Sequence, residues 1–339
     1  MYDTALAQLF AYHARILRDG ARVDAYRNAL LHCVRPGDVV LDLGSGTGVL
    51  ALFACQAGAR KVYAIERGRI AELARRLVAA SGFGDRIEIL VKESTSVTIP
   101  ERANVLVTET LWNFGLGEGL LTAVADAKVR LLAPSARIIP GRVELFAAPA
   151  DAALAFEHFD IWNDPRLGLN LSAVRRTVLA TVYPFAADAG ALLAQASRLA
   201  TVELDGDIDA RGSIGGDATF CVQRSGTMHG LVGWFQAELA HGILLSNSPS
   251  SASNSWSQAL LPVDPPLFVE PGDTLDTRID AIGDGSVWRW RVEHRRGELA
   301  LAVREHSTLA GFARFGAAAA AYGAESPTEC SRAARADEP

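Results

Sequence analysis

The segment from Val39 to Gly48 constrains the fold of this 339-residue chain more than any other feature. Its sequence, VVLDLGSGTG, is a short apolar run followed by three glycines at alternate positions, and an apolar helical pattern continues to Ala57. Glycine permits a sharp turn and lets a ligand approach the backbone, while the start of a helix presents unpaired N–H groups. The segment therefore predicts a strand, a ligand-binding turn and a helix.

Similar apolar runs recur at residues 62–65, 87–91 and 105–107, and helical patterns at 48–57 and 70–81 lie between the first of them. Short buried strands that alternate with helices are typical of a doubly wound parallel sheet. We therefore expect an α/β domain of the Rossmann-like type. Apolar residues at helical spacing before it predict two helices that meet near Asp19-Gly20.

The pattern changes after Pro140. Alternating apolar and polar residues, as in 287–292, and turns such as Pro271-Gly-Asp predict antiparallel strands. The expected organisation is an α/β domain over residues 1–145, an all-β domain over 146–315 with a helical insertion at about 162–199, and a flexible tail over 316–339.

Composition narrows the function classes. The chain is 49% hydrophobic and 21% charged, which suits two folded domains, and its net charge of −6 argues against binding nucleic acid through phosphate contacts. The four cysteines show no short-range pairing, the N-terminus lacks a signal pattern, and no apolar run is long enough to span a membrane. We expect a cytoplasmic protein that binds no nucleic acid, membrane or metal.

Glu66 ends the second predicted strand, a position from which a carboxylate can bind the two hydroxyls of a ribose. The glycine spacing is G-x-G-x-G with Asp42 before it, whereas nicotinamide-binding dehydrogenases carry G-x-G-x-x-G. The pattern resembles motif I of the class I methyltransferases, which implies S-adenosyl-L-methionine as cofactor. A dehydrogenase, or a turn with a purely structural role, remains the alternative.

Two carboxylates, Glu109 and Glu118, lie in the loop TETLWNFGLGEG after the fourth predicted strand. This loop falls at the carboxyl edge of the sheet, where open α/β sheets bind their ligands. A planar guanidinium presents a rigid fork of donors that matches carboxylates, so two acids can grip it. Alternatively, Glu118 only begins a helix, where an acid is favoured by the helix dipole.

This loop resembles the double-E loop of the protein arginine methyltransferases, and residues 102–119 are most similar to their type III branch, arginine methyltransferase 7. Residues 17–28 resemble the family's N-terminal helix, and 48–62 its post-glycine helix. The resemblance covers roughly residues 10–310. It implies methyl transfer from S-adenosylmethionine to a guanidino nitrogen of arginine, either free or in a peptide or protein. It also implies a β-barrel second domain and a helical arm that pairs two subunits in a homodimer.

The resemblance also assigns roles to residues. It implies that Arg22 pairs with the methionine carboxylate of the cofactor, that Glu66 holds the ribose, and that Trp112 lines the acceptor pocket. A histidine on a helix is more often packed than functional, although His13 matches a position near the cofactor. The implied cofactor-binding residues are His13, Arg22, Asp42, Gly44, Gly46, Gly48 and Glu66, with Thr95 or Ser96 at the position of the adenine-contacting acid.

The chain departs from the family where a Thr-His-Trp loop would enter the site. Trp256 is retained as an aromatic wall, but Ser255 stands in place of the histidine. In the family that histidine pairs with the acid matched by Asp19, a pair proposed to tune the site or remove a proton. Because serine is no base near neutral pH, we expect Asp19 to have another partner or its role to be dispensable.

Two further hypotheses stay open. The chain could be a methyltransferase of another small amine or hydroxyl, since the pocket wall differs from that of many relatives. It could also be a non-catalytic, methyltransferase-like dimeric scaffold, a hypothesis that draws on Ser255 and Thr95.

Overall fold

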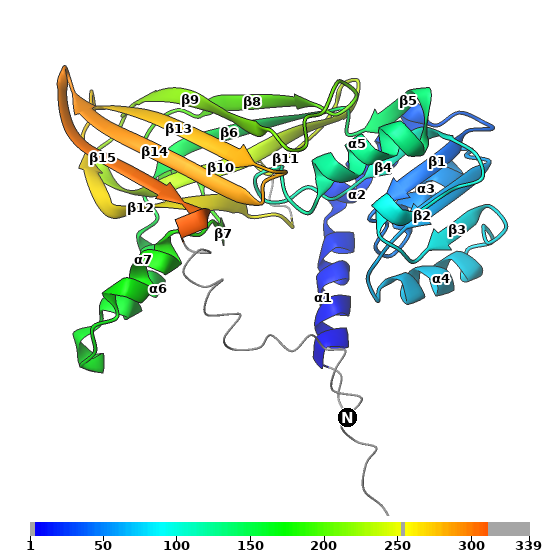
Figure 1. Cartoon of the computed structure of the whole chain (residues 1–339), viewed down its shortest axis with the longest axis horizontal. Coiled ribbons are helices and arrows are strands. Elements are labelled where there is room, and N and C mark those ends of the chain that lie inside the picture. Colours follow the sequence, from blue (N-terminus) through cyan, green and yellow to red (C-terminus); the bar gives the residue numbers. More distant parts are fainter. Residues whose placement is uncertain (1–3, 252–254, 311–339) are drawn as a thin grey trace, which may run out of the picture.

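The chain folds into a parallel sheet beside two antiparallel sheets (Figure 1). A computed structural model describes residues 4–251 and 255–310. The two expected N-terminal helices are present as α1 (Thr4–Arg18) and α2 (Gly20–Cys33), and they meet at Asp19. The Asp19 side chain accepts a hydrogen bond from the backbone N–H of Arg22 at 3.1 Å, so it caps the start of α2.

The parallel sheet has the strand order β3-β2-β1-β4-β5, with all pairs parallel. Since the chain leaves β1 to one side and later returns to β4 on the other, the loops after β1 and β4 flank the switch point at the carboxyl edge. All five side chains of β1 are buried. The elements are β1 (Val39–Leu43), α3 (Val49–Gln56), β2 (Lys61–Ile65), α4 (Ala71–Ala80), β3 (Ile87–Leu90), β4 (Ala103–Thr108), α5 (Leu120–Arg130) and β5 (Leu132–Ile139).

The remaining strands form the expected barrel from a six-stranded and a four-stranded antiparallel sheet. The first has the order β7-β12-β10-β6-β8, with β11 paired to β10, and the second the order β15-β14-β13-β9. Alternate side chains of β13 are buried, as the alternating sequence predicts. The strands are β6 (Arg142–Ala150), β7 (Tyr183–Phe185), β8 (Ser197–Glu203), β9 (Ser213–Cys221), β10 (Gly226–Ala240), β11 (Ile243–Ser246), β12 (Gln258–Val269), β13 (Thr274–Ile282), β14 (Val287–Arg296) and β15 (Leu299–Ser307).

Two helices, α6 (Ala153–Asp160) and α7 (Ser172–Leu179), project from one end of the barrel (Figure 1). α6 lies before the insertion expected at 162–199, whereas α7, β7 and the start of β8 fall inside that range. Phe156 and Phe159 anchor α6 because they are buried against Trp234 of the barrel. Residues 316–339, where a tail was expected, lie outside the described residues. No described helix is long and apolar enough to cross a membrane.

Candidate active site

A cavity of about 900 Å³ opens at the carboxyl edge of the parallel sheet. It lies among α1, α2, the loops after β1, β2, β3 and β4, and the turn between β13 and β14. The cavity is therefore located where ligands bind in open α/β sheets. It brings together residues that are far apart in the sequence, including Gly44, Glu66, Glu109 and Glu118.

The glycine loop is fixed by the carboxylate of Glu66. One Glu66 oxygen accepts a hydrogen bond from the backbone N–H of Gly46 at 2.9 Å, and the other from Gly68 at 2.6 Å. Gly44 has a φ of 70°, and a Cβ there would lie 2.7 Å from Cγ2 of Thr110. Only glycine fits this turn, which packs directly against the loop that carries Glu109.

Asp42 and Gly48 flank the glycine loop in the sequence but do not line the cavity. Asp42 is fully buried at the end of β1, and burial raises the pKa of its carboxyl to about 7. Gly48 has a φ of 79° and begins α3. Whereas Gly44 and Gly46 line the cavity, these two residues shape the turn beneath it.

His13 lines the cavity beside the glycine loop, since a Cβ on Gly46 would lie 3.2 Å from the His13 ring. Burial lowers the pKa of His13, so its imidazole is neutral at pH 7. The structure thus places this histidine at the candidate cofactor site.

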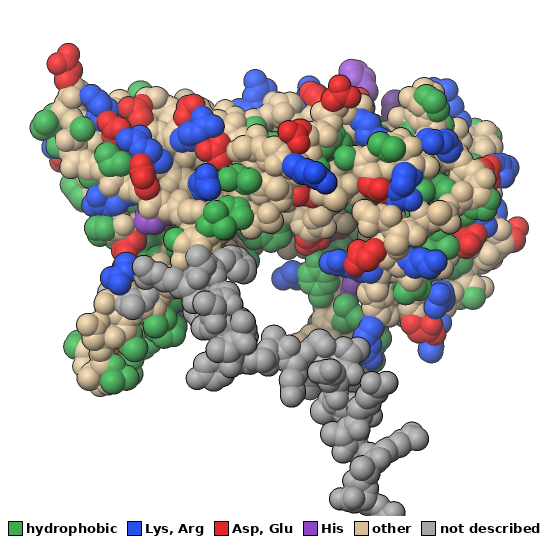
Figure 2. Space-filling view, viewed as in Figure 1, with side chains coloured by type: hydrophobic (Ala, Val, Ile, Leu, Met, Phe, Trp, Pro, Cys, Tyr) green, Lys and Arg blue, Asp and Glu red, His purple; other side chains and the backbone are tan. Residues whose placement is uncertain are grey.

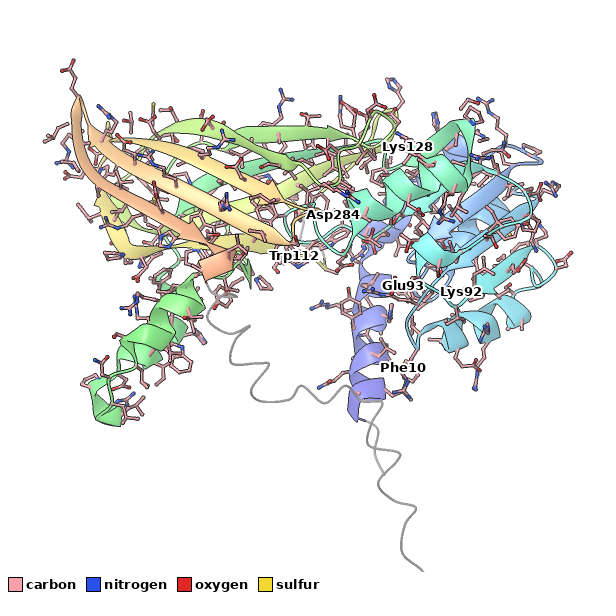
Figure 3. The ribbon with its side chains drawn as sticks, viewed as in Figure 1. Phe10, Lys92, Glu93, Trp112, Lys128 and Asp284 are labelled. Carbon is pink, nitrogen blue, oxygen red and sulfur yellow. The ribbon has the colours of Figure 1, made fainter. Side chains whose placement is uncertain are left out.

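The loop after β3 brings one of its two candidate residues, Thr95 or Ser96, to the cavity. Thr95 lines the cavity, but the Ser96 hydroxyl instead donates to the backbone carbonyl of Glu93 at 2.8 Å. Lys92 and Glu93, which are labelled in Figure 3 and were not predicted, also line the cavity. Glu93 pairs with Arg67 at 3.0 Å. An acid is therefore present in this loop, two residues before the position where the resemblance places it.

Glu109 and Glu118 both line the cavity that contains the glycine loop. Glu118 has a φ of 53°, in the left-handed region, and lies between Gly117 and Gly119, which also have positive φ values. Non-glycine residues adopt this conformation rarely, and such strain concentrates at functional sites. Glu118 is exposed at the cavity mouth, yet desolvation by the surrounding protein raises the pKa of its carboxyl, against the opposing effect of Arg22.

Arg22 is buried against the double-E loop. Its guanidinium forms an ion pair with Glu109, donates to the Ser255 hydroxyl at 2.9 Å, and lies 3.7 Å from the centre of the Trp256 ring. Burial lowers the pKa of Arg22 to about 10, which leaves it charged at pH 7. Arg22 is therefore not a solvent-exposed helix residue. Its guanidinium lies between the Glu109 carboxylate and the Trp256 ring, a position that we call the guanidinium seat.

Asp19 connects α2 to the barrel. One carboxylate oxygen accepts the N–H of Arg22, and the other accepts the backbone N–H of Ser255 at 2.5 Å. A backbone amide therefore occupies the place that a histidine side chain takes in the family resemblance. Through these two contacts Asp19 links the start of α2 to the barrel segment that carries Ser255.

Trp256 and Trp112 have different surroundings. The Trp256 indole N–H donates to the carbonyl of Leu111 at 3.0 Å, which fixes its ring under Arg22. Trp112 packs against Gly117, where a Cβ would lie 3.0 Å from the Trp112 Cβ, and its ring centre lies 6.5 Å from that of Trp288. Trp112 therefore braces the loop that carries Glu118.

The barrel also holds α5, the helix that follows Glu118, as Figure 3 shows. The Asp284 carboxylate accepts the backbone N–H groups of Leu121 at 2.9 Å and Thr122 at 3.0 Å. Near the other end of α5, the Lys128 ammonium donates to the carbonyl of Asp205 at 2.8 Å. Asp284 was not predicted, because no local sequence pattern indicates its contact with α5.

No group of His, Cys, Asp and Glu in residues 4–251 and 255–310 is arranged to hold a metal ion. The chemistry available at this cavity therefore rests, within those residues, on carboxylates, guanidinium groups and backbone amides.

Comparison with known proteins gives two matches to family models. Residues 142–288 match the arginine methyltransferase oligomerization subdomain, and residues 27–130 match the ribosomal protein L11 methyltransferase (PrmA). The two models thus cover the barrel from β6 to β13 with its helices, and most of the parallel sheet.

The chain is also similar to curated proteins. It is 30% identical over 297 residues to the histone-arginine methyltransferase CARMER of Anopheles gambiae, a match that covers 82% of this chain and 48% of that protein. It therefore spans about half of that relative's length. It is 29% identical to protein arginine N-methyltransferase 6 of Xenopus laevis, which covers 76% of this chain and 79% of the relative.

Solved structures share the fold. The PRMT1 enzyme-prozyme complex of Trypanosoma brucei with AdoHcy has a TM-score of 0.77 at 23% identity, covering 87% of this chain and 96% of that one. Protein arginine methyltransferase 10 of Arabidopsis thaliana has a TM-score of 0.74 at 21% identity, covering 88% and 99%. The family models and the curated relatives support the protein arginine methyltransferase family for this chain, and the solved structures share its fold.

Proposed function

We propose that this chain is an S-adenosylmethionine-dependent methyltransferase that methylates a guanidino nitrogen of arginine. The observation that carries the proposal is the seat at Glu109. There a guanidinium, that of Arg22, already lies between a carboxylate and the Trp256 ring, beside the cavity with the glycine loop. A site that holds one guanidinium in this way has the shape and charge to hold another.

The cavity fits S-adenosylmethionine. Glu66 is held at the end of β2 by two backbone amides, the position from which a carboxylate binds a ribose, and the start of α3 adjoins the glycine turn. His13, Arg22 and Thr95 also line this space, and Glu93 lies in the loop expected to contact the adenine. When bound, the cofactor supplies a methyl group that passes from its sulfonium to the acceptor nitrogen, leaving S-adenosylhomocysteine.

The chain's own residues orient the acceptor and manage its charge. Arginine has a pKa above about 12, so it arrives as a delocalised cation and a poor nucleophile. Glu109 and Glu118 hold two of its nitrogens and localise the positive charge there, which leaves the third nitrogen available to bond the methyl carbon. Glu118, whose pKa is raised, accepts the proton that this nitrogen loses. The rest of the rate enhancement comes from alignment and fixed charges.

Assembly and location complete the proposal. Residues 1–145 form the cofactor-binding domain and 146–315 the barrel domain, and the helices that project from the barrel pair two copies in a homodimer. The match to an oligomerization subdomain supports this, as do the exposed apolar side chains Leu154 (74% exposed) and Leu169 (68%) on the projecting segment. We place the homodimer in the cytoplasm, where cysteines without pairing are expected to stay reduced.

Product analysis tests the proposed function. The protein is incubated with methyl-labelled S-adenosylmethionine and, in parallel, with free L-arginine and arginine-containing peptides, and the products are identified by mass spectrometry. We expect the label on a guanidino nitrogen. Label on another amine or on a hydroxyl would support a different methyltransferase. No labelled product together with no thermal shift by S-adenosylhomocysteine would support the scaffold hypothesis.

A further inference from the structure

A second cavity, of about 590 Å³, borders the guanidinium seat from the barrel side. Its wall includes Ser255 and Trp256, which contact the Arg22 guanidinium together with Glu109. Arg22 itself lines the larger cavity, together with Glu109. The two cavities therefore meet at the guanidinium seat, with the candidate cofactor site on one side and the second cavity on the other.

The rim of the second cavity carries three charges that are available to a ligand. Arg15 and Arg18 lie in the last turn of α1, and neither forms an ion pair or hydrogen bond with the described part of the chain, although Arg15 lies 5.6 Å from the Tyr12 ring. In Figure 2, basic side chains stand where α1 lies in Figure 1. Asp188 uses one oxygen to accept the Ala191 N–H at 2.9 Å.

The inner part of this cavity carries one further charge, on Asp19, which is not available to a ligand in the same way. Asp19 lines the cavity, but both of its oxygens are occupied by the backbone amides of Arg22 and Ser255. A ligand in the second cavity would therefore meet, at the rim, two arginines without ion pairs among the described residues and one partly used carboxylate. Deeper inside it would meet hydroxyl groups and the Trp256 ring.

These charges match the main-chain end of a free amino acid. From Cα to Cζ, an extended arginine side chain spans about 6 Å. Trp256, whose ring contacts the guanidinium in the seat, lines the same cavity as Arg15, Arg18 and Asp188. An arginine with its guanidinium in the seat can thus bring its α-carboxylate to the arginine side of the rim and its α-ammonium toward Asp188.

We propose that the second cavity recognises the charged main-chain groups of free L-arginine, so that the acceptor is a free amino acid rather than an arginine-rich peptide. A peptide main chain carries neither charge, and neighbouring arginines of a basic peptide would be repelled by Arg15 and Arg18. The inference rests on the proposed function, since it requires an acceptor guanidinium in the seat. Arg22 then turns into the larger cavity, which it already lines.

A structural explanation for the two arginines has to be separated from this one. Basic residues in the last turn of a helix are stabilised by the helix dipole, whatever ligand the protein binds. In that case their removal changes the thermal stability of the protein and leaves its choice of acceptor unchanged. The decisive readout is therefore acceptor preference rather than activity alone.

The experiment compares kcat/KM for L-arginine, for L-argininamide, which lacks the carboxylate charge, for agmatine, which lacks the carboxylate, and for an arginine-rich peptide. We expect L-arginine to exceed the other three by at least about tenfold, the effect of one charged hydrogen-bonded contact. The double variant R15Q/R18Q should lower kcat/KM for L-arginine by a similar factor, mostly through KM, and leave that for L-argininamide unchanged. D188N should lower kcat/KM for L-arginine and for agmatine by similar factors, because both carry the ammonium group.

Arg76→Gln is the matched control, because Arg76 is also an exposed arginine of a helix, α4, but lies outside this cavity. Calorimetric titration of L-arginine and L-argininamide into wild-type protein with S-adenosylhomocysteine gives a readout that needs no variant. A peptide methylated as well as L-arginine, or a preference that survives R15Q/R18Q, would overturn this inference and leave the proposed function standing. If wild-type protein methylates no guanidine although it binds S-adenosylhomocysteine, the proposed function fails as well.

Discussion

Glu66 and Glu109 lie at the same edge of the same sheet, but their partners differ in kind. The oxygens of Glu66 are bonded to the backbone amides of Gly46 and Gly68, whereas Glu109 is paired with the Arg22 side chain. Backbone partners can leave only if the loop refolds, while a side chain can turn away. The difference indicates a cofactor side that is fixed by the backbone and an acceptor side whose contacts can be exchanged.

The two sides also differ in origin. The glycine loop is assembled from neighbouring strands of the parallel sheet. The acceptor side depends on the barrel, which contributes Trp256 beneath the seat and Asp284 at the start of α5. Damage to the barrel contacts should therefore affect acceptor chemistry while cofactor binding persists, and each prediction below tests this contrast.

The largest effect is expected for Glu109→Gln and Glu118→Gln. Each change removes a negative charge from the guanidinium seat, and loss of one fixed electrostatic contact at a reacting group costs on the order of 10²- to 10³-fold in kcat. Affinity for S-adenosylhomocysteine should stay within a few-fold. Single-turnover kinetics and calorimetry measure the two quantities, with the exposed Glu101→Gln as control. Near-normal turnover in both variants would falsify the assignment of these acids.

Glu66→Gln should affect the cofactor side of the site rather than the acceptor side. It removes a charge that holds two backbone amides and faces the candidate ribose site, so we expect the Kd for S-adenosylhomocysteine to rise about tenfold or more. At saturating cofactor, kcat should change less than in the Glu118 variant. Titration calorimetry gives the affinity. A large fall in kcat at unchanged affinity would mean that the two sides are not separable.

Asp284 tests the contribution of the barrel. Asp284→Gly keeps the positive φ of 62° but removes both contacts with α5, so we expect kcat to fall about tenfold, the effect of losing a helix cap, with unchanged cofactor affinity. Asp284→Asn, which retains one acceptor oxygen, should recover part of the rate. Lys128→Ala frees the far end of α5 and should lower the Tm rather than kcat. Equal losses of kcat in the Asp284→Gly and Lys128→Ala variants would argue against a role in positioning Glu118.

The smallest effect is expected for Asp42, which lies beside the glycine loop on the cofactor side of the site. Because burial raises the pKa of this carboxyl from 3.8 to about 7, its contribution to stability is full below pH 4 and is lost as the pH rises through 7. The Tm of the wild-type protein should therefore fall, relative to Asp42→Asn, between pH 5 and pH 8. Thermal denaturation of both proteins without ligand measures this difference, and parallel curves would contradict it.

Local sequence patterns predicted most of the cofactor side of the site. The run Val39–Leu43 was predicted as a strand and is β1, and the break at Asp19 separates two helices, because an apolar run and a capping residue act over a few residues. The glycine spacing likewise predicted the turn. The loop after β3 was placed less well, since its polar residues have no periodicity that would fix the register of Glu93 and Thr95.

Contacts between distant segments could not be predicted in the same way. The Arg22 guanidinium meets Ser255, 233 residues away, and Asp284 reaches α5 across 163 residues. No local pattern specifies such a pair, and only the packing of the barrel against the sheet brings the residues together. The bounds of α6 were also missed, because its anchoring aromatic residues pack on a barrel strand that lies far along the chain.

The most direct test is a crystal structure with S-adenosylhomocysteine and whichever of L-arginine or an arginine peptide proves to be methylated. We expect the acceptor guanidinium to lie on Trp256 between Glu109 and Glu118, with Arg22 turned toward the cofactor. An acceptor bound elsewhere, with Arg22 still paired to Glu109, would contradict this expectation.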